Sequence, residues 1–292
     1  MKRQAELLVD ANAQLGEGPS WHAEEQRLYW VDIIGKTLHG YDPATGKDVT
    51  WDLPEEAGCV VPRKSGGLVL GLKSGLAFFD PHTGTTDVIC TVEKEHADMR
   101  FNDGKCDPAG RFWAGTMHGA LKESVGKLYC LDTDLTLREM ETNITTSNGL
   151  AWNQDATVMY YIDTPTRQVV AYDYDIDTGT ISGKRVVIEV PDDMGWPDGM
   201  TIDQEGMLWT AMWGGWKITR WNPDTGILLA SHEVPAKNTT SCCFGGSTLR
   251  DLYITTARTG NPEEDLESQP TAGGLFKLQT DVQGTETFAF GG

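Results

Sequence analysis

Short apolar segments, most with a central aromatic residue, recur along the chain. Six of them begin about 40–50 residues apart, a spacing that indicates a repeated structural unit. They read LYWVD at 28–32, LVLGL at 68–72, RFWAGT at 111–116, VMYYIDT at 158–164, MLWTAMW at 207–213 and DLYITTA at 251–257. No long stretch has the 3.6-residue period of an amphipathic helix, so we expect short strands and few helices.

Two other kinds of segment flank each apolar one. A second apolar segment follows it, and several copies run into Asp-Thr-Gly or a similar turn signal. A segment of small residues, often with Gly, precedes it and suits an inner strand where several strands converge on one axis. We therefore predict an all-β, six-bladed β-propeller with about four antiparallel strands per blade. A pair of β-sandwiches would not require six phased repeats.

The chain of 292 residues is long enough for either one domain or two. The six repeats predict a single propeller domain over residues 1–292. Residues 5–10, AELLVD, are predicted to form a strand that closes the ring against residues 285–290, TETFAF. Closure of this kind protects sheet edges that would otherwise be open.

Charge narrows the class of partner. The chain has 43 Asp plus Glu against 24 Lys plus Arg, a formal net charge of −19, which argues against nucleic acid and against an anionic membrane surface. The N-terminal apolar stretch is too short for a signal peptide, and no run of about 18 apolar residues occurs. Six cysteines without a C-x-x-C pair are interpreted as reduced, buried thiols. We expect a cytoplasmic protein.

Polar residues beside glycine recur in the predicted inner strands. Equivalent positions in different blades converge near one mouth of a central channel. A buried carboxylate needs a partner, and carboxylate and amide oxygens bind hard cations. Each Asn-Gly or Asp-Gly pair alone is also an ordinary turn signal. The interpretation as a cation site therefore depends on these pairs standing at equivalent positions of separate blades. The residues are Glu17 in GEGPSW, Arg100, Asn102 and Asp103 in RFNDGK, Asn148 in SNGL and Asp198 in PDGM.

Taken in order, these motifs resemble the senescence-marker-protein, regucalcin and gluconolactonase family. The resemblance runs from about Leu15 to Leu278 and includes LGEGPSW, RFNDGKCDPAGRFWAGTM, SNGLAW, YYIDT, PDGMTID, CCFGG and AGGLFKL. It implies a six-bladed propeller holding one divalent cation, which is calcium, zinc, manganese or ferrous iron in different members. The implied ligands are Glu17, Asn148 and Asp198, and Arg100 and Asn102 are the implied substrate contacts.

One stretch departs from the animal members of the family. Residues 117–127 form a shorter loop with His118, where the animal proteins carry a longer acidic segment, and bacterial aldonolactonases look more like this version. Asp103 is interpreted either as a turn residue or as a residue that contacts the cation ligands without binding the cation itself. The Trp213–Trp216 segment is expected either to wall the mouth or to pack in a blade.

Family members hydrolyse sugar lactones, so the hypothesis is a metal-dependent lactonase of the gluconolactonase type. Asp198 would act as general base, and Arg100 and Asn102 would hold the sugar hydroxyls. The expected partner is a small sugar lactone, and the expected state is a monomer or weak homo-oligomer. Two alternatives stay open: a calcium-binding regulatory protein of the regucalcin type without significant lactonase activity, and an interaction module with a structural metal. No G-x-S-x-G motif supports a serine hydrolase.

Overall fold

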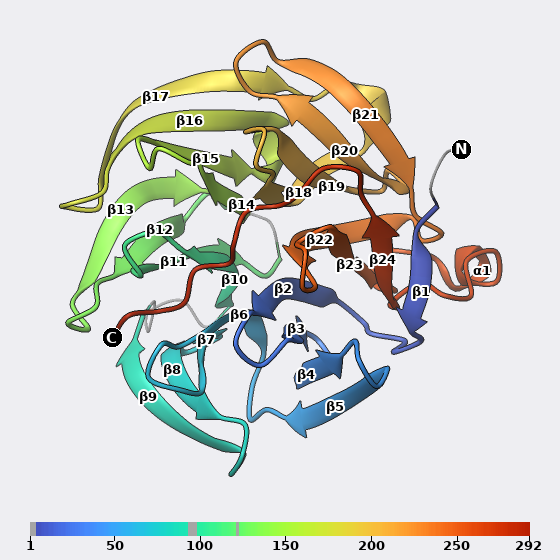
Figure 1. Cartoon of the computed structure of the whole chain (residues 1–292), viewed down its shortest axis with the longest axis horizontal. Coiled ribbons are helices and arrows are strands. Elements are labelled where there is room, and N and C mark those ends of the chain that lie inside the picture. The colour runs from blue at the N-terminus through green and yellow to red at the C-terminus, as the bar shows by residue number, and fades with distance from the viewer. Residues whose placement is uncertain (1–3, 93–97, 121–122) are drawn as a thin grey trace.

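A computed structural model describes residues 4–92, 98–120 and 123–292. These residues form six four-stranded antiparallel sheets arranged as blades around a central axis, which confirms the predicted six-bladed propeller (Figure 1). Blades one to five are formed by β2–β5, β6–β9, β10–β13, β14–β17 and β18–β21. Blade six combines β22–β24 with β1.

Each class of sequence segment occupies one position in the blades. The small-residue segments are the inner strands β2 (Gly16–His22), β6 (Ala57–Pro62), β10 (Met99–Cys106), β14 (Ser147–Trp152), β18 (Trp196–Ile202) and β22 (Asn238–Gly245). The apolar segments are the second strands β3 (Arg27–Asp32), β7 (Leu68–Leu72), β11 (Phe112–His118), β15 (Val158–Asp163), β19 (Leu208–Trp213) and β23 (Asp251–Ala257). Both positions are largely buried, because each blade is covered by its neighbours on two sides.

The two remaining strands of each blade lie farther from the axis. The third strands are β4 (Thr37–Asp42), β8 (Gly75–Asp80), β12 (Gly126–Leu131), β16 (Gln168–Asp175), β20 (Lys217–Asn222) and β24 (Leu275–Gln279). The outer strands are β5 (Lys47–Asp52), β9 (Thr85–Thr91), β13 (Leu137–Ile144), β17 (Thr180–Glu189), β21 (Ile227–Glu233) and β1 (Glu6–Val9). The helical elements are the single turns η1 (Thr164–Thr166), η2 (Asp192–Met194) and α1 (Glu263–Leu266).

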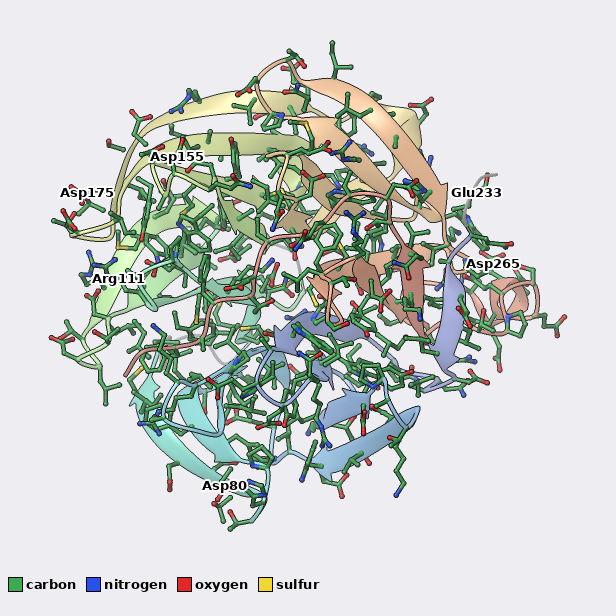
Figure 2. All side chains as sticks on the ribbon, viewed as in Figure 1. Asp80, Arg111, Asp155, Asp175, Glu233 and Asp265 are labelled. Atoms are coloured by element: carbon green, nitrogen blue, oxygen red, sulfur yellow. The ribbon has the colours of Figure 1, made fainter. Side chains whose placement is uncertain are left out.

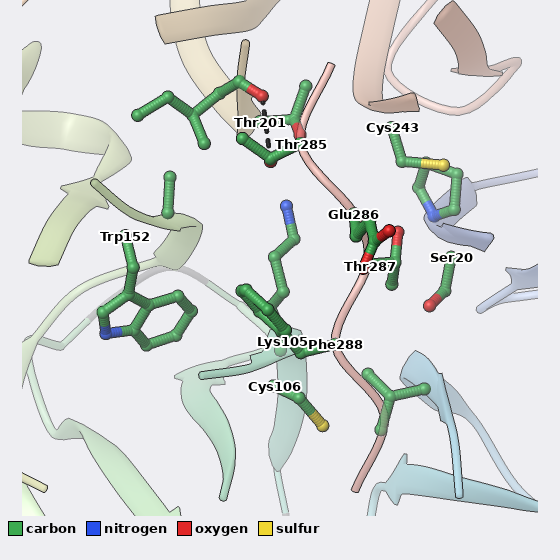
Figure 3. A pocket seen from close by; sticks show the side chains of 15 residues that line it. Ser20, Lys105, Cys106, Trp152, Thr201, Cys243, Thr285, Glu286, Thr287 and Phe288 are labelled. Atoms are coloured by element: carbon green, nitrogen blue, oxygen red, sulfur yellow. Dashed lines mark hydrogen bonds between the residues drawn. The ribbon is translucent and has the colours of Figure 1, made fainter. Parts of the chain in front are cut away.

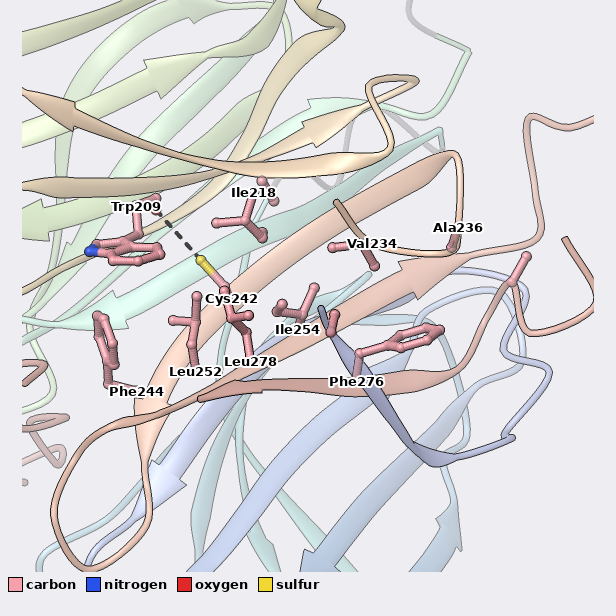
Figure 4. Close-up of a cluster of buried hydrophobic side chains, with 13 residues drawn as sticks. Trp209, Ile218, Val234, Ala236, Cys242, Phe244, Leu252, Ile254, Phe276 and Leu278 are labelled. Atoms are coloured by element: carbon pink, nitrogen blue, oxygen red, sulfur yellow. Dashed lines mark hydrogen bonds between the residues drawn. The ribbon is translucent and has the colours of Figure 1, made fainter. Parts of the chain in front are cut away.

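A cluster of buried apolar side chains fills each of the six interfaces between neighbouring blades. Between blades five and six, Trp209 and Ile218 pack against Cys242, Phe244 and Leu252 (Figure 4). The thiol of Cys242 donates to the carbonyl oxygen of Trp209 at 3.5 Å, so this cysteine is part of the interface packing. Burial of such side chains stabilises the ring by about 1.5–3 kcal/mol each.

The ring closes differently from the prediction. Residues 5–10 do supply the closing strand, but β1 pairs with β24, with Glu6 opposite Lys277 and Leu7 opposite Phe276. The predicted pairing with residues 285–290 is therefore wrong. Residues 285–290 are not a strand of blade six, because β1 already fills its outer position.

Instead, the C-terminal segment crosses the axis on one face of the ring (red in Figure 1). Its last aromatic residue, Phe290, is fully buried in the cluster between blades two and three. The Phe290 amide donates to the Pro62 carbonyl at 2.8 Å, and the Lys64 amide donates to the Phe290 carbonyl at 2.8 Å.

Many of the acidic residues lie at the periphery. Asp80, Asp175, Glu233 and Asp265 lie around the rim of the disc (Figure 2). Carboxylates in this position are solvated, and they contribute to the negative net charge without defining a site. Among the described residues, no helix has the length and apolar character needed to cross a membrane.

Candidate functional site

The predicted site residues lie at irregular points of the inner strands. Pairing between the inner and second strands shifts register in all six blades, and in four of them the shift lies beside a candidate residue. These four shifts fall between Glu17 and Ser20, Phe101 and Gly104, Asn148 and Leu150, and Pro197 and Met200. Such bulges change the direction of side chains locally and are frequent beside active sites.

Glycine after the site residues lets the inner strands approach each other. A Cβ atom placed on Gly149 would lie 2.9 Å from the carbonyl oxygen of Asp198 and 2.8 Å from the Cβ of Met200. Only glycine fits this close approach between β14 and β18. The Asn-Gly and Asp-Gly pairs of the sequence therefore bring Asn148 and Asp198 together at the axis.

Three of the predicted residues form one hydrogen-bonded chain. The Arg100 guanidinium donates through Nη1 to Oδ1 of Asn102 at 2.6 Å and to the Phe101 carbonyl at 3.0 Å. Nδ2 of Asn102 donates to the Ser147 carbonyl at 2.7 Å and to Oδ1 of Asn148 at 3.1 Å. The implied substrate contacts on β10 are therefore joined directly to an implied cation ligand on β14.

The two predicted carboxylate ligands are buried close to each other. Glu17 is 3% exposed and Asp198 is 5% exposed. Burial raises the pKa of Glu17 well above its usual value, and the carboxylates of Asp198 and Asp103 raise it further. Burial likewise raises the pKa of Asp198, with Asp103 adding to the effect, whereas a hydrogen bond from the side chain of Asn148 lowers it.

Asp103 is a third acidic residue in this group. The sequence places it in a turn or behind the ligands, and the structure shows it buried on β10, 4% exposed, with its charge acting on both Glu17 and Asp198. Burial raises its own pKa, and the ammonium group of Lys105 opposes the rise. Its position before Gly104 is the signal that it shares with Glu17, Asn148 and Asp198, and in the sequence it is grouped with them for that reason.

The donor set fits a divalent cation. Glu17, Asp198 and Asn148 offer carboxylate and amide oxygens, the ligands preferred by hard cations, and the buried carboxylates lack sufficient positive charge nearby. Within the described ranges, no three His, Cys, Asp or Glu side chains gather as a candidate metal cluster. Asp103 therefore does not complete a metal cluster with Glu17 and Asp198, and the third oxygen of the candidate set comes from the amide of Asn148.

A threonine missed by the sequence analysis completes the surroundings of Asn148. Oγ1 of Thr164 accepts a hydrogen bond from Nδ2 of Asn148 at 2.7 Å and donates to the Pro197 carbonyl at 2.8 Å. Thr164 begins η1, immediately after β15. In the sequence it belongs to YYIDT, which contributed to the family resemblance without being assigned a role.

The C-terminal segment lies over the other end of the inner strands. Thr285, Glu286, Thr287 and Phe288 face Lys105 and other inner-strand residues around a cavity of about 40 Å³ (Figure 3). The ammonium group of Lys105 donates to the Met200 carbonyl at 2.6 Å. The candidate ligands lie nearer the starts of the inner strands, on the side away from this segment.

Aromatic residues lie at the same end of blade five as Asp198. Trp196 and Trp213 are paired across β18 and β19, and Trp196 and Trp216 are 39% and 38% exposed. In the 117–127 loop, residues 121–122 lie outside the described residues. His118 is at the end of β11, where its Nδ1 accepts from the Ala120 amide at 3.1 Å.

Comparisons with known proteins agree with the fold and the motifs. Residues 15–258 match the family model described as SMP-30/Gluconolactonase/LRE-like region. The Bacillus subtilis (strain 168) protein YvrE, named provisionally as a sugar lactone lactonase, is 39% identical over 288 residues and 99% of each chain. Regucalcin of Danio rerio is 39% identical over 292 residues and 99% of each chain.

A solved structure gives the same answer. The Agrobacterium tumefaciens protein described as a calcium-binding protein, regucalcin, superposes with a TM-score of 0.94 at 27% identity. The match covers 99% of this chain and 97% of that one. The family match over most of the chain and the close relatives lead to one conclusion: this chain belongs to the SMP-30/gluconolactonase/LRE-like family.

Proposed function

We propose that this protein is a metal-dependent hydrolase that opens a sugar lactone to the aldonic acid. The observation that carries the proposal is the meeting of two buried carboxylates, Glu17 and Asp198, with the hydrogen-bonded chain of Arg100, Asn102 and Asn148. The family match and the name of the Bacillus subtilis relative support the same class of reaction.

Glu17, Asn148 and Asp198 would hold the cation, which is calcium, zinc, manganese or ferrous iron. A bound divalent cation supplies polarisation of an ester carbonyl and acidification of water. The two ligand carboxylates balance a charge of 2+, so the occupied set is close to neutral. A neutral lactone is accommodated there, and the anionic product is not retained by excess positive charge.

Asp198 is proposed as the general base. Its carboxylate is buried on β18 beside the other candidate ligands, where it can take a proton from a water molecule held at the site. The proton would later pass to the oxygen of the opened ring, which leaves as a hydroxyl group.

Arg100 and Asn102 are proposed to bind the substrate. One nitrogen of the Arg100 guanidinium is held by Asn102, and its remaining N–H groups would donate to sugar hydroxyls and to the oxygen that gains negative charge. Burial lowers the pKa of Arg100, while the carboxylates of Glu56, Glu17 and Asp198 oppose that shift. A partly buried guanidinium of this kind interacts strongly with a developing oxyanion.

A calcium-binding regulatory role is the second candidate. The oxygen-only donor set suits calcium, and the Agrobacterium relative is described as a calcium-binding protein. The Arg100–Asn102 pair favours the hydrolase. Calcium binding requires only the oxygen ligands, and a positively charged guanidinium beside them does not strengthen it.

A panel of lactones and metals tests the proposal. Glucono-, galactono-, xylono- and arabinonolactone would be followed by pH-stat with chelator and with calcium, manganese, zinc or ferrous iron. We expect acceleration for at least one lactone, and its loss on chelation. No acceleration for any lactone would favour the regulatory role. Full activity after exhaustive chelation would contradict the metal-dependent mechanism while leaving lactonase activity in place.

A further inference from the structure

The hydroxyl group of Thr164 lies between two candidate ligands that belong to different blades. It accepts from Nδ2 of Asn148 in blade four at 2.7 Å and donates to the carbonyl oxygen of Pro197 in blade five at 2.8 Å. Pro197 immediately precedes Asp198 on β18. A single side chain therefore contacts one ligand directly and the backbone next to another.

The chemistry at the two ends of the hydrogen-bonded chain determines its direction. A guanidinium can only donate, so Oδ1 of Asn102 must face Arg100 and Nδ2 of Asn102 must face Asn148. At the other end, the Pro197 carbonyl can only accept, so the Thr164 hydroxyl must donate to it. The lone pairs of Thr164 are then available only as acceptors for Asn148.

This direction fixes which side of the Asn148 amide faces the site. Oδ1 of Asn148 accepts from Asn102 and keeps a second lone pair, whereas Nδ2 donates to Thr164. The opposite orientation would present N–H groups where a cation requires an oxygen. It would also leave the Thr164 and Asn102 hydrogen bonds without complementary partners.

We propose that Thr164 is a positioning residue that orients the Asn148 amide and holds it against β18, and that it thereby sets the affinity of the site for its cation. This inference rests on the proposed function, because it assumes that Asn148 is a ligand. Thr164 itself binds neither cation nor substrate. Partners behind the ligands of metal sites commonly change metal affinity by about 10–100-fold when they are removed.

A matched set of threonine variants separates this role from a general effect on folding. Thr164→Val keeps the shape and removes the hydroxyl, and Thr164→Ser keeps the hydroxyl and removes the methyl group. Thr166→Val is the control: Thr166 lies in the same η1 turn and donates to the Asp163 carbonyl at 2.7 Å, without contact to Asn148. Binding of Mn²⁺ and of Ca²⁺ to the metal-stripped proteins would be measured by calorimetry, beside kcat and KM for lactone opening.

We expect Thr164→Val to weaken cation binding by about tenfold or more, and Thr164→Ser and Thr166→Val to bind as wild type does. Wild-type cation affinity in Thr164→Val would overturn this inference and leave the proposed function standing. Equal weakening of cation binding in Thr164→Val and Thr164→Ser would do the same. Should the valine variant fail to fold, Thr164→Cys, a weak donor and acceptor of similar size, takes its place with the same expected result. A wild-type protein that binds neither of these cations, nor zinc or ferrous iron in the same measurement, would overturn the proposed function and this inference with it.

Discussion

The side-chain amide nitrogen of Asn102 lies 3.1 Å from the side-chain oxygen of Asn148. This contact joins β10 of blade three to β14 of blade four, and Asn102 is bonded at its other end to Arg100. The proposed substrate-binding pair and a proposed cation ligand therefore form one network. A change in either part should be detected in the behaviour of the other.

Replacement of Asn102 by Asp should impair lactone opening. The change replaces the Nδ2 donor by an acceptor, which leaves the Ser147 carbonyl without its partner and places two oxygens against each other at Asn148. We expect kcat/KM to fall by about tenfold or more, since Asn148 is no longer held in place by Asn102. Asn153→Asp, in an exposed turn of blade four, is the control. Wild-type kcat/KM in Asn102→Asp would show that the contact is unimportant.

Replacement of Asp198 by Asn should stabilise the metal-free protein. The substitution removes a buried carboxylate that lies beside two others, Glu17 and Asp103. In chelator we expect a higher Tm than wild type, whereas cation at about 100 times its Kd should stabilise only the wild type, by about 2.7 kcal/mol. Scanning fluorimetry measures both effects, with the exposed Asp224→Asn as control. A cation-induced shift of equal size in Asp198→Asn would exclude Asp198 as a ligand.

Acid should destabilise the protein partly through His232. Its ring stacks on Trp209 with centroids 5.5 Å apart, and burial, helped by the charge of Arg220, lowers its pKa below 6.5. As pH falls through about 6.5, the unfolded chain therefore takes up a proton that the folded protein does not, and stability decreases.

Urea unfolding at about pH 7.5 and about pH 5.5 measures this contribution. We expect wild type to lose more stability between the two values than His232→Gln does. His82→Gln, in an exposed turn, should behave as wild type. An identical loss in wild type and His232→Gln would mean that His232 makes no contribution.

The C-terminal segment should contribute to stability through its last aromatic residue. Phe290 is fully buried, and its ring centroid lies 6.3 Å from that of Phe78. Phe290→Ala should lower the free energy of unfolding by about 3–5 kcal/mol, the usual range for a buried phenylalanine. Phe288→Ala, at a partly buried position of the same segment, should cost less. Equal and small losses in the two variants would mean that this segment is not anchored by Phe290.

Local sequence patterns predicted the fold because every blade repeats the same order of small, apolar and turn segments. The pairing of β1 was harder to predict, since TETFAF has the alternation of a strand and pairing partners distant in sequence leave no local signal. Glu17, Asn148 and Asp198 were recognisable because each stands before a glycine in an inner strand. Thr164 was not, because its role arises only where two blades meet, and alone it is an ordinary residue after a strand.

A titration of the metal-free protein tests the central claim most directly. Cation would be removed by chelator and gel filtration and then added back in steps, while bound cation and lactone hydrolysis are measured in the same samples. We expect activity to rise in proportion to bound cation and to level off at one cation per chain, and we expect Glu17→Gln to show neither binding nor hydrolysis under these conditions. Full hydrolysis before any cation is added, or its complete recovery in Glu17→Gln at the same stoichiometry, would contradict the claim that these inner-strand residues form a metal-dependent lactonase site.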